Sequence, residues 1–117
     1  MNTKLIGAMG EKAAARYLRE NGYEILSANY KTNVGEIDIV AIKDSIVCFV
    51  EVKTRKVSTF SSPADAVDRK KEENVKGTSA AYMSRYKLKN ETRFDIVEVY
   101  LNESGKVKDI NHIINAF

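Results

Sequence analysis

The stretch GEIDIVAIKDSIVCFVEVKTR, residues 35–55, decides the fold of this chain, because two runs rich in β-branched residues flank a short polar turn. GEIDIVAIK and IVCFVEVKTR are typical of strands, and Asp44 and Ser45 between them predict a hairpin. IVCFV is apolar on both faces, which favours a central strand that is covered on both sides. The sequence therefore predicts a hairpin in the middle of a sheet.

Helices are expected before and after this hairpin. The Ala- and Leu-rich run from Leu5 to Asn21 is typical of a helix, and Gly22 follows it where a left-handed C-terminal cap is expected. The polar run KVSTFSSPADAV predicts a loop that leads into a second helix. That helix would have a serine N-cap and Pro63 at its first position, and it would end near Tyr86.

Shorter runs predict the remaining strands. YEILSANY precedes the hairpin, RFDIVEVYL follows the second helix, and KVKDINHIINAF is expected to form an extended edge or short strand after the turn NESG. The order helix, three strands, helix, one or two strands predicts an α/β fold, a mixed β-sheet flanked by helices. A length of 117 residues fits a single domain that spans residues 1–117.

The composition restricts the class of protein. No run approaches the roughly 18 apolar residues that span a bilayer, and Glu11 and Lys12 interrupt the N-terminal run before a signal-peptide core forms. We therefore expect a cytoplasmic protein with no membrane partner. The net charge of +3 favours polyanionic partners only weakly. Cys48 is expected to fill the core, and the only histidine, His112, is expected to be structural because no second histidine exists for a zinc site.

Charged residues lie where the two central strands stop being apolar. Residues two apart in a strand share a face, so Glu51, Lys53 and Arg55 project together, and the hairpin turn brings Asp38 antiparallel to Glu51. Two neighbouring carboxylates repel each other, and in a partly buried place one takes up a proton unless a cation joins them. Hard oxygen ligands favour Mg²⁺ or Mn²⁺, with water and substrate phosphate completing the coordination.

Phosphate chemistry follows from such a site. A bound metal ion lowers the pKa of a water molecule, while Lys53 would orient that water or offset charge in the transition state. Glu11 lies on the small, apolar side of the first helix and would approach the same site, cap a backbone group or pair with a lysine. The alternative for Asp38, Glu51 and Lys53 is a solvated strand end with an ion pair between Glu51 and Lys53.

Five runs, IGAMGEKAAARYL, GEIDIVA, FVEVKTR, RFDIVEV and HIINAF, occur in an order that resembles the YraN-like family of small bacterial proteins. That family is similar to the PD-(D/E)xK, or restriction-endonuclease-like, nuclease superfamily, particularly to archaeal Holliday junction resolvases. The resemblance implies a restriction-endonuclease-like core in which Asp38 and Glu51 hold the metal, Lys53 assists catalysis and Glu11 completes the site. It also implies that Val52 offers its backbone carbonyl to the metal while its side chain packs in the core.

The chain departs from these patterns at two positions. Ile37 precedes Asp38 where the superfamily has proline, so the link to the superfamily depends on the acids and the lysine. Glu72 follows Lys71 where the family commonly has glutamine, and an acid there would weaken a contact with phosphate or water. Nuclease folds also host proteins that only bind.

Basic residues on both sides of the acids are expected to hold the phosphates of a nucleic acid, with binding that falls steeply as salt rises. These residues are Arg55, Lys56, Arg69, Lys70 and Lys71. The leading hypothesis is a Mg²⁺-dependent nuclease or nuclease-like protein that acts on a DNA junction, flap or end. The alternatives are a non-catalytic binding or interaction module and an enzyme that needs a partner. A homodimer is one possible arrangement, because the resemblance is to junction resolvases, which work as pairs, and because the apolar C-terminal run IINAF has surface to cover.

Overall fold

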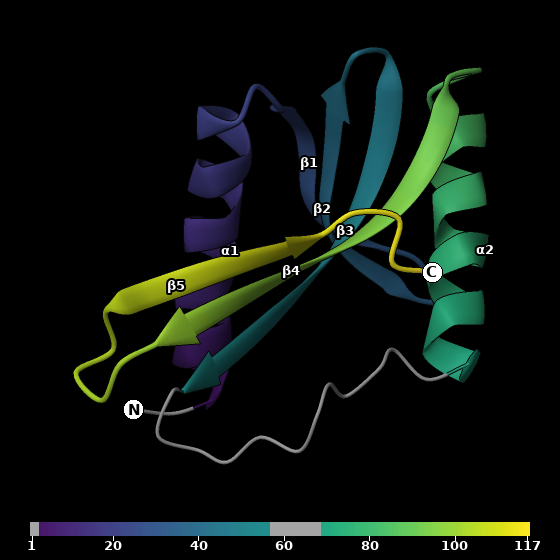
Figure 1. The fold of residues 1–117 in the computed structure, drawn as a ribbon. Coiled ribbons are helices and arrows are strands. Elements are labelled where there is room, and N and C mark those ends of the chain that lie inside the picture. Colours follow the sequence, from purple (N-terminus) through teal and green to yellow (C-terminus); the bar gives the residue numbers. More distant parts are fainter. Residues whose placement is uncertain (1–2, 57–68) are drawn as a thin grey trace.

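The computed structural model describes residues 3–56 and 69–117 (Figure 1). The helices and strands follow one another as α1 (Thr3–Glu20), β1 (Glu24–Lys31), β2 (Glu36–Lys43), β3 (Ile46–Lys56), α2 (Arg69–Arg85), β4 (Glu91–Leu101) and β5 (Val107–Ile113). This order confirms the predicted one and shows that the final extended segment is a strand. The predicted helix start at Pro63 lies outside the described residues.

The strands form one mixed sheet in the order β1-β2-β3-β4-β5. Neighbouring strands are antiparallel except β3 and β4, which are parallel. A parallel pair needs a crossover connection, and α2 lies in the segment that joins β3 to β4. The predicted mixed α/β sheet is therefore confirmed, with β3 in its centre.

The hairpin of β2 and β3 forms where the sequence predicts it. Asp44 and Ser45 both adopt left-handed backbone angles, with φ of 51° and 65°. Two consecutive residues with positive φ give the turn whose twist matches that of the flanking strands. The turn sets the register in which Lys43 lies opposite Ile46 and Ile39 lies opposite Val50.

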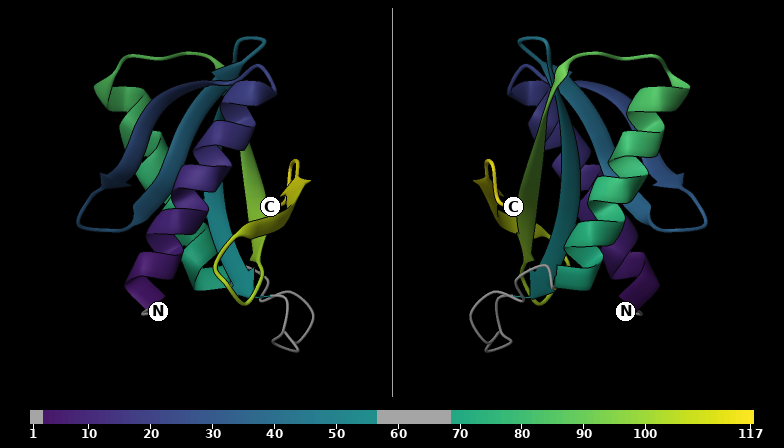
Figure 2. Two further views of the ribbon diagram at one scale, coloured as in Figure 1. Left: turned by 90° about the vertical axis from the view of Figure 1, so that its left-hand side faces the viewer. Right: turned by 90° about the vertical axis from the view of Figure 1, so that its right-hand side faces the viewer.

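The two helices cover opposite faces of the sheet, as the two side views of Figure 2 show. Cys48 and Val50 of β3 pack in the core on the α1 side, whereas Val47 and Phe49 pack on the α2 side. All four side chains are at most 1% exposed. The central, doubly covered strand and the core position of Cys48 are thus confirmed.

Helix α1 approaches β3 very closely at Gly10. A Cβ atom at this position would lie 1.7 Å from Thr54 Oγ1, so only glycine permits this packing distance. The residues that α1 buries are Gly10, Ala14 and Leu18, and the close approach brings the next residue, Glu11, to the sheet. Among the described residues, no helix is both long and apolar enough to cross a membrane.

Candidate functional site

The acid pair lies where β2 and β3 separate. The ladder between these strands ends with Ile39 opposite Val50, and the next residue on each strand is an acid, Asp38 or Glu51. Asp38 Oδ2 accepts a hydrogen bond of 2.8 Å from the backbone N–H of Val52. A carboxylate therefore takes the place that a backbone carbonyl of β2 would have in a continued ladder. The two predicted ligands come together at this split.

Cavities open onto the acid pair from both faces of the sheet. One of about 300 Å³ lies beside α1 and is lined by Glu11, Asp38, Glu51 and Val52 among others. Another of about 230 Å³ lies beside α2 and is lined by both acids together with Lys71. Both carboxylates therefore line open space on either face of the sheet.

Asp38 is an acid whose ionised form is unfavourable in this position. Burial and the negative charges of Glu51 and Glu11 raise its pKa, and the Val52 N–H and the charge of Lys71 lower it, so that it is raised overall from 3.8 to about 7. Near neutral pH the carboxyl group is thus close to half protonated. A cation at this place would favour the ionised form, as the sequence argument expects for two neighbouring acids.

Glu51 already has a cationic partner, and this partner comes from α2. Its side chain is 7% exposed, and its Oε1 forms an ion pair with Lys71 Nζ. Lys53 lies on the same face of β3, two residues further on, but it forms no ion pair with another described residue. The alternative with an ion pair between Glu51 and Lys53 is therefore wrong: the lysine that contacts Glu51 is Lys71, which sequence reasoning assigned to phosphate.

Val52 is oriented as the resemblance implies. Its N–H faces Asp38, and the N–H and carbonyl of one strand residue point toward the same neighbouring strand. The Val52 carbonyl thus faces the side of the acid pair, while the side chain packs against the core beneath α1. Two carboxylates and this carbonyl form a set of hard oxygen donors, which suits Mg²⁺ or Mn²⁺.

Glu11 reaches the site from α1 with a partner that sequence reasoning missed. With its amide nitrogen turned toward the two acids, Asn29 donates to Glu36 Oε1 and Glu11 Oε2, each at 3.3 Å. Asn29 has a left-handed backbone with φ of 53°, which asparagine tolerates, but nothing in the sequence names its partners. Within residues 3–56 and 69–117, no three His, Cys, Asp or Glu side chains converge as a metal site. The predicted three-acid set is therefore not preformed.

Comparison with known proteins places the chain in a family. The sequence model of a protein family, described as "Uncharacterised protein family UPF0102", matches residues 10–99. The chain belongs to the UPF0102 family. This confirms the YraN-like resemblance drawn from the sequence, and the matched segment contains Glu11, Asp38, Glu51 and Lys53.

Relatives within UPF0102 match over the whole chain. A UPF0102 protein of Syntrophomonas wolfei is 48% identical over 118 residues, which cover 100% of both chains. One of Caldanaerobacter subterraneus is 44% identical over 119 residues, which cover all of this chain and 98% of the relative. One of Clostridioides difficile is 44% identical over 118 residues that cover both chains completely. The full-length agreement means that the site described above lies in the segment shared with these proteins.

The other basic residues of this UPF0102 protein differ in how they are arranged. Arg55 Nε lies 3.3 Å from Glu98 Oε2, and the two side chains are only 11% and 10% exposed. Arg69 lies in an exposed ion pair with Glu73, and Lys70 is exposed on the same helix. Lys56 is the last residue of β3. Arg55 thus faces a buried acid of the sheet, whereas the α2 residues present their charges to solvent.

Glu72, the departure from the family pattern noted above, does not contact the acid pair. Its Oε1 accepts a hydrogen bond of 3.2 Å from Lys76 Nζ, one turn further along α2. The acid after Lys71 is therefore paired within the helix, so its charge is directed along α2 rather than into the cavity.

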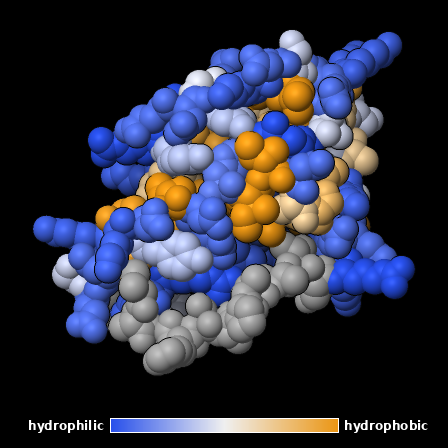
Figure 3. Space-filling view, in the orientation of Figure 1, coloured by the Kyte–Doolittle hydropathy of each residue, from blue (hydrophilic) through white to orange (hydrophobic). Residues whose placement is uncertain are grey.

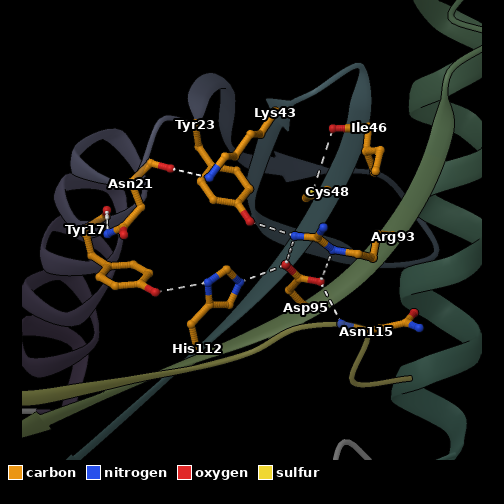
Figure 4. Close-up of polar contacts among 10 residues, drawn as sticks. All are labelled: Tyr17, Asn21, Tyr23, Lys43, Ile46, Cys48, Arg93, Asp95, His112 and Asn115. Carbon is orange, nitrogen blue, oxygen red and sulfur yellow. Dashed lines mark hydrogen bonds and ion pairs between the residues drawn. The ribbon is translucent and has the colours of Figure 1, made fainter.

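A second polar cluster ties the C-terminal strand of this UPF0102 protein to the rest of the fold (Figure 4). Asp95, fully buried, accepts two hydrogen bonds of 2.9 and 2.8 Å from Arg93 and one of 3.0 Å from the Asn115 N–H. His112 Nε2 lies 2.8 Å from Asp95, and its Nδ1 lies 3.2 Å from the Tyr17 hydroxyl on α1. His112 therefore has the structural surroundings that the sequence analysis expects.

The pKa of Asp95 reflects these contacts. Burial raises the pKa, but the hydrogen bonds from His112, Arg93 and Asn115 outweigh burial and bring it from 3.8 to about 2. The sequence analysis missed this cluster, because in the sequence Asp95 is only one polar residue within the strand run RFDIVEV.

Proposed function

We propose that this UPF0102 protein is a metal-dependent nuclease, or a nuclease-like nucleic-acid-binding protein, that acts on phosphodiester bonds in a DNA junction, flap or end. The observation that carries the proposal is the pairing of Asp38 and Glu51 at the split between β2 and β3, open to cavities on both faces. Burial and the charge of Glu51 make the ionised form of Asp38 unfavourable despite the contacts with Val52 and Lys71, and an acid perturbed in this way beside a cavity is typical of a functional site.

The residues have separate roles in this proposal. Asp38, Glu51 and the Val52 carbonyl would hold Mg²⁺ or Mn²⁺, with Glu11 approaching from α1. When bound, such an ion polarises a phosphoryl oxygen and lowers the pKa of a water molecule. Lys53, on the same face as Glu51, would orient the attacking water or offset negative charge on the phosphate. The water oxygen would bond to phosphorus and release one proton to solvent, the bond between phosphorus and the leaving oxygen would break, and that oxygen would take up one proton from solvent.

The test of this function measures metal binding before turnover. Calorimetric titration with Mg²⁺ and Mn²⁺ would compare the wild type, Asp38→Ala and the control Asp109→Ala, whose acid is exposed on β5. The same samples would then meet labelled branched, flapped and single-stranded DNA. We expect Asp38→Ala alone to lose both metal binding and cleavage. A wild type that binds no metal, even with DNA present, would eliminate the catalytic proposal.

A non-catalytic binding module is the second candidate, and the ion pair of Lys71 with Glu51 favours it, because an ammonium group already occupies one carboxylate. The two candidates differ in their metal requirement. A binder retains DNA affinity in excess chelator and cuts no substrate, whereas the nuclease cuts only when Mg²⁺ or Mn²⁺ is added. Gel-shift and cleavage assays on one set of substrates separate these outcomes.

Pairing of two copies remains part of the proposal. Apolar side chains at the end of β5 and beyond it support it, since Ile113 and Ile114 are 36% and 55% exposed. Figure 3 shows apolar surface in the middle of that view, surrounded by hydrophilic residues. Light scattering at rising protein concentration would measure the mass, and a mass of one chain throughout would contradict a homodimer.

A further inference from the structure

We propose that Lys71 is a built-in cation that occupies Glu51 while the site holds no metal and leaves it when a divalent metal binds, so that its ammonium group then becomes available to a nucleic-acid phosphate. This inference rests on the proposed function and adds a regulatory step to the same site. Lys71 would thus be a positioning residue with two alternative partners.

The asymmetry of the ion pair supports this exchange. Glu51 is 7% exposed and sits on the central strand, whereas Lys71 is 45% exposed and reaches the acid from α2. A buried carboxylate cannot return to water, but a lysine on a flexible four-carbon stem can move its ammonium group into solvent. The lysine is therefore the partner that would leave.

The cavity beside α2 places the alternative partners within reach of one another. Lys71 lines this space of about 230 Å³ together with Asp38, Glu51 and Asn74. A metal ion at Asp38 and Glu51 needs a Glu51 oxygen, and Lys71 already contacts Oε1. Because two cations repel each other at such close range, metal binding and the ion pair compete.

The neighbouring cations of α2 lie in a different setting. Lys76 pairs with Glu72, and Arg69 pairs with Glu73, each one turn along the helix. Lys70 is exposed and does not line the cavity of the acid pair. Lys70 is therefore a matched control: it has the same charge and helix but no contact with Glu51.

The first measurement is the Mg²⁺ dissociation constant of the wild type, Lys71→Met, Lys71→Gln and Lys70→Met by calorimetry without DNA. Lys71→Met keeps the length of the side chain and removes its charge. We expect Lys71→Met and Lys71→Gln to bind Mg²⁺ about tenfold more tightly than the wild type, and Lys70→Met to bind within about twofold of it. Equal or weaker binding in both Lys71 variants would overturn the inference.

Thermal unfolding gives a second readout that needs no turnover. In chelator, Lys71→Met leaves Glu51 buried without its partner and should unfold at a lower temperature than Lys70→Met. Saturating Mg²⁺ should then raise its unfolding temperature by more than it raises that of the wild type. A similar or smaller rise in Lys71→Met than in the wild type would count against the exchange.

DNA binding tests the second partner of Lys71. In Ca²⁺, used to occupy a metal site while slowing cleavage, the salt dependence of binding to a branched DNA should correspond to about one fewer phosphate contact in Lys71→Met than in the wild type. In chelator the two slopes should agree, because Lys71 then contacts Glu51. Equal salt-dependence slopes of the wild type and Lys71→Met under both conditions would mean that Lys71 does not contact a DNA phosphate.

The outcomes separate this inference from the proposed function. If the wild type binds Mg²⁺ and the Lys71 variants do not bind it more tightly, the inference fails and the proposed function stands. If only the Lys71 variants bind Mg²⁺, with or without DNA, Lys71 never leaves Glu51 in the wild type, so the exchange and the catalytic function both fail. If no variant binds Mg²⁺ or Mn²⁺, with or without DNA, both fail together.

Discussion

Replacing Asp38 by asparagine should stabilise the folded protein at pH 8 in the absence of metal, although the substitution removes a site residue. The carboxyl group has a pKa of about 7 in the folded chain against 3.8 as its ordinary value. Asparagine has nearly the same shape, carries no charge and still offers an oxygen to the Val52 N–H. The change therefore removes the unfavourable charge while keeping the hydrogen bond.

The sign and size of the effect follow from the pKa shift. Between about pH 4 and pH 7 the folded chain holds a proton that the unfolded chain has released, so the stability of the wild type falls as the pH rises through this window. A shift of about 3 pKa units corresponds to about 4 kcal/mol at most. Solvent around the partly exposed side chain reduces this, and we expect Asp38→Asn to gain roughly 2 to 4 kcal/mol relative to the wild type between pH 4 and pH 8.

Urea denaturation followed by circular dichroism, in chelator at several pH values from 4 to 8, measures this difference. The control is Asp109→Asn, whose acid is exposed on β5 and should give a difference that is nearly constant with pH. Adding Mg²⁺ should stabilise the wild type more at pH 8 than at pH 5 and should have little effect on Asp38→Asn. A stability difference for Asp38→Asn that stays the same from pH 4 to pH 8 would refute the reasoning.

Three other substitutions test the packing and the charges around the site. Gly10→Ala brings a Cβ atom against Thr54 and should lower the free energy of unfolding, measured in urea, by roughly 1 to 3 kcal/mol. The double variant that also carries Thr54→Ala should recover part of this loss. No recovery in the double variant would contradict a clash between the two side chains. Asn29→Asp adds a third acid between two carboxylates and should lower the free energy of unfolding by about 1 kcal/mol at pH 8 and by little at pH 4. The control Asn29→Gly keeps the left-handed backbone and measures the loss of the amide alone. Equal effects of Asn29→Asp at both pH values would exclude charge repulsion. Asp95→Asn leaves the arginine of its cluster without a counter-charge and should cost roughly 3 to 5 kcal/mol at pH 7. Because the pKa of Asp95 is lowered to about 2, the wild type should lose about 2 kcal/mol as the pH falls from 4 to 2, and acid titration of Asp95→Asn should lack this loss.

Much of the acid pair could be predicted because it depends on local geometry. Once the turn at Asp44 and Ser45 is recognised, counting back along both strands places Asp38 across from Glu51. The alternation of a strand then assigns Lys53 to the same face as Glu51 and Val52 to the core. These steps need only the turn position and a period of two.

The partners of these residues could not be predicted in the same way. Lys71 is 20 residues from Glu51 in the sequence, and its contact depends on how α2 packs against β2 and β3. In the alternative to a metal site, this acid would pair with Lys53, which is closer in the chain but lies beside it on one strand. Asn29 escaped notice because its role depends on the meeting of α1, β1 and β2.

The sequence by itself determined the order of helices and strands, the central hairpin and the pairing of Asp38 with Glu51, because hydrophobic period, turn chemistry and register act over a few neighbouring residues. Only the tertiary structure decided which cation neutralises Glu51 and which groups surround Asp95. His112 and Tyr17 are 95 residues apart in the chain yet 3.2 Å apart at their contacting atoms. Such contacts depend on the packing of whole helices against the sheet, and many charged residues of similar local sequence compete for each partner.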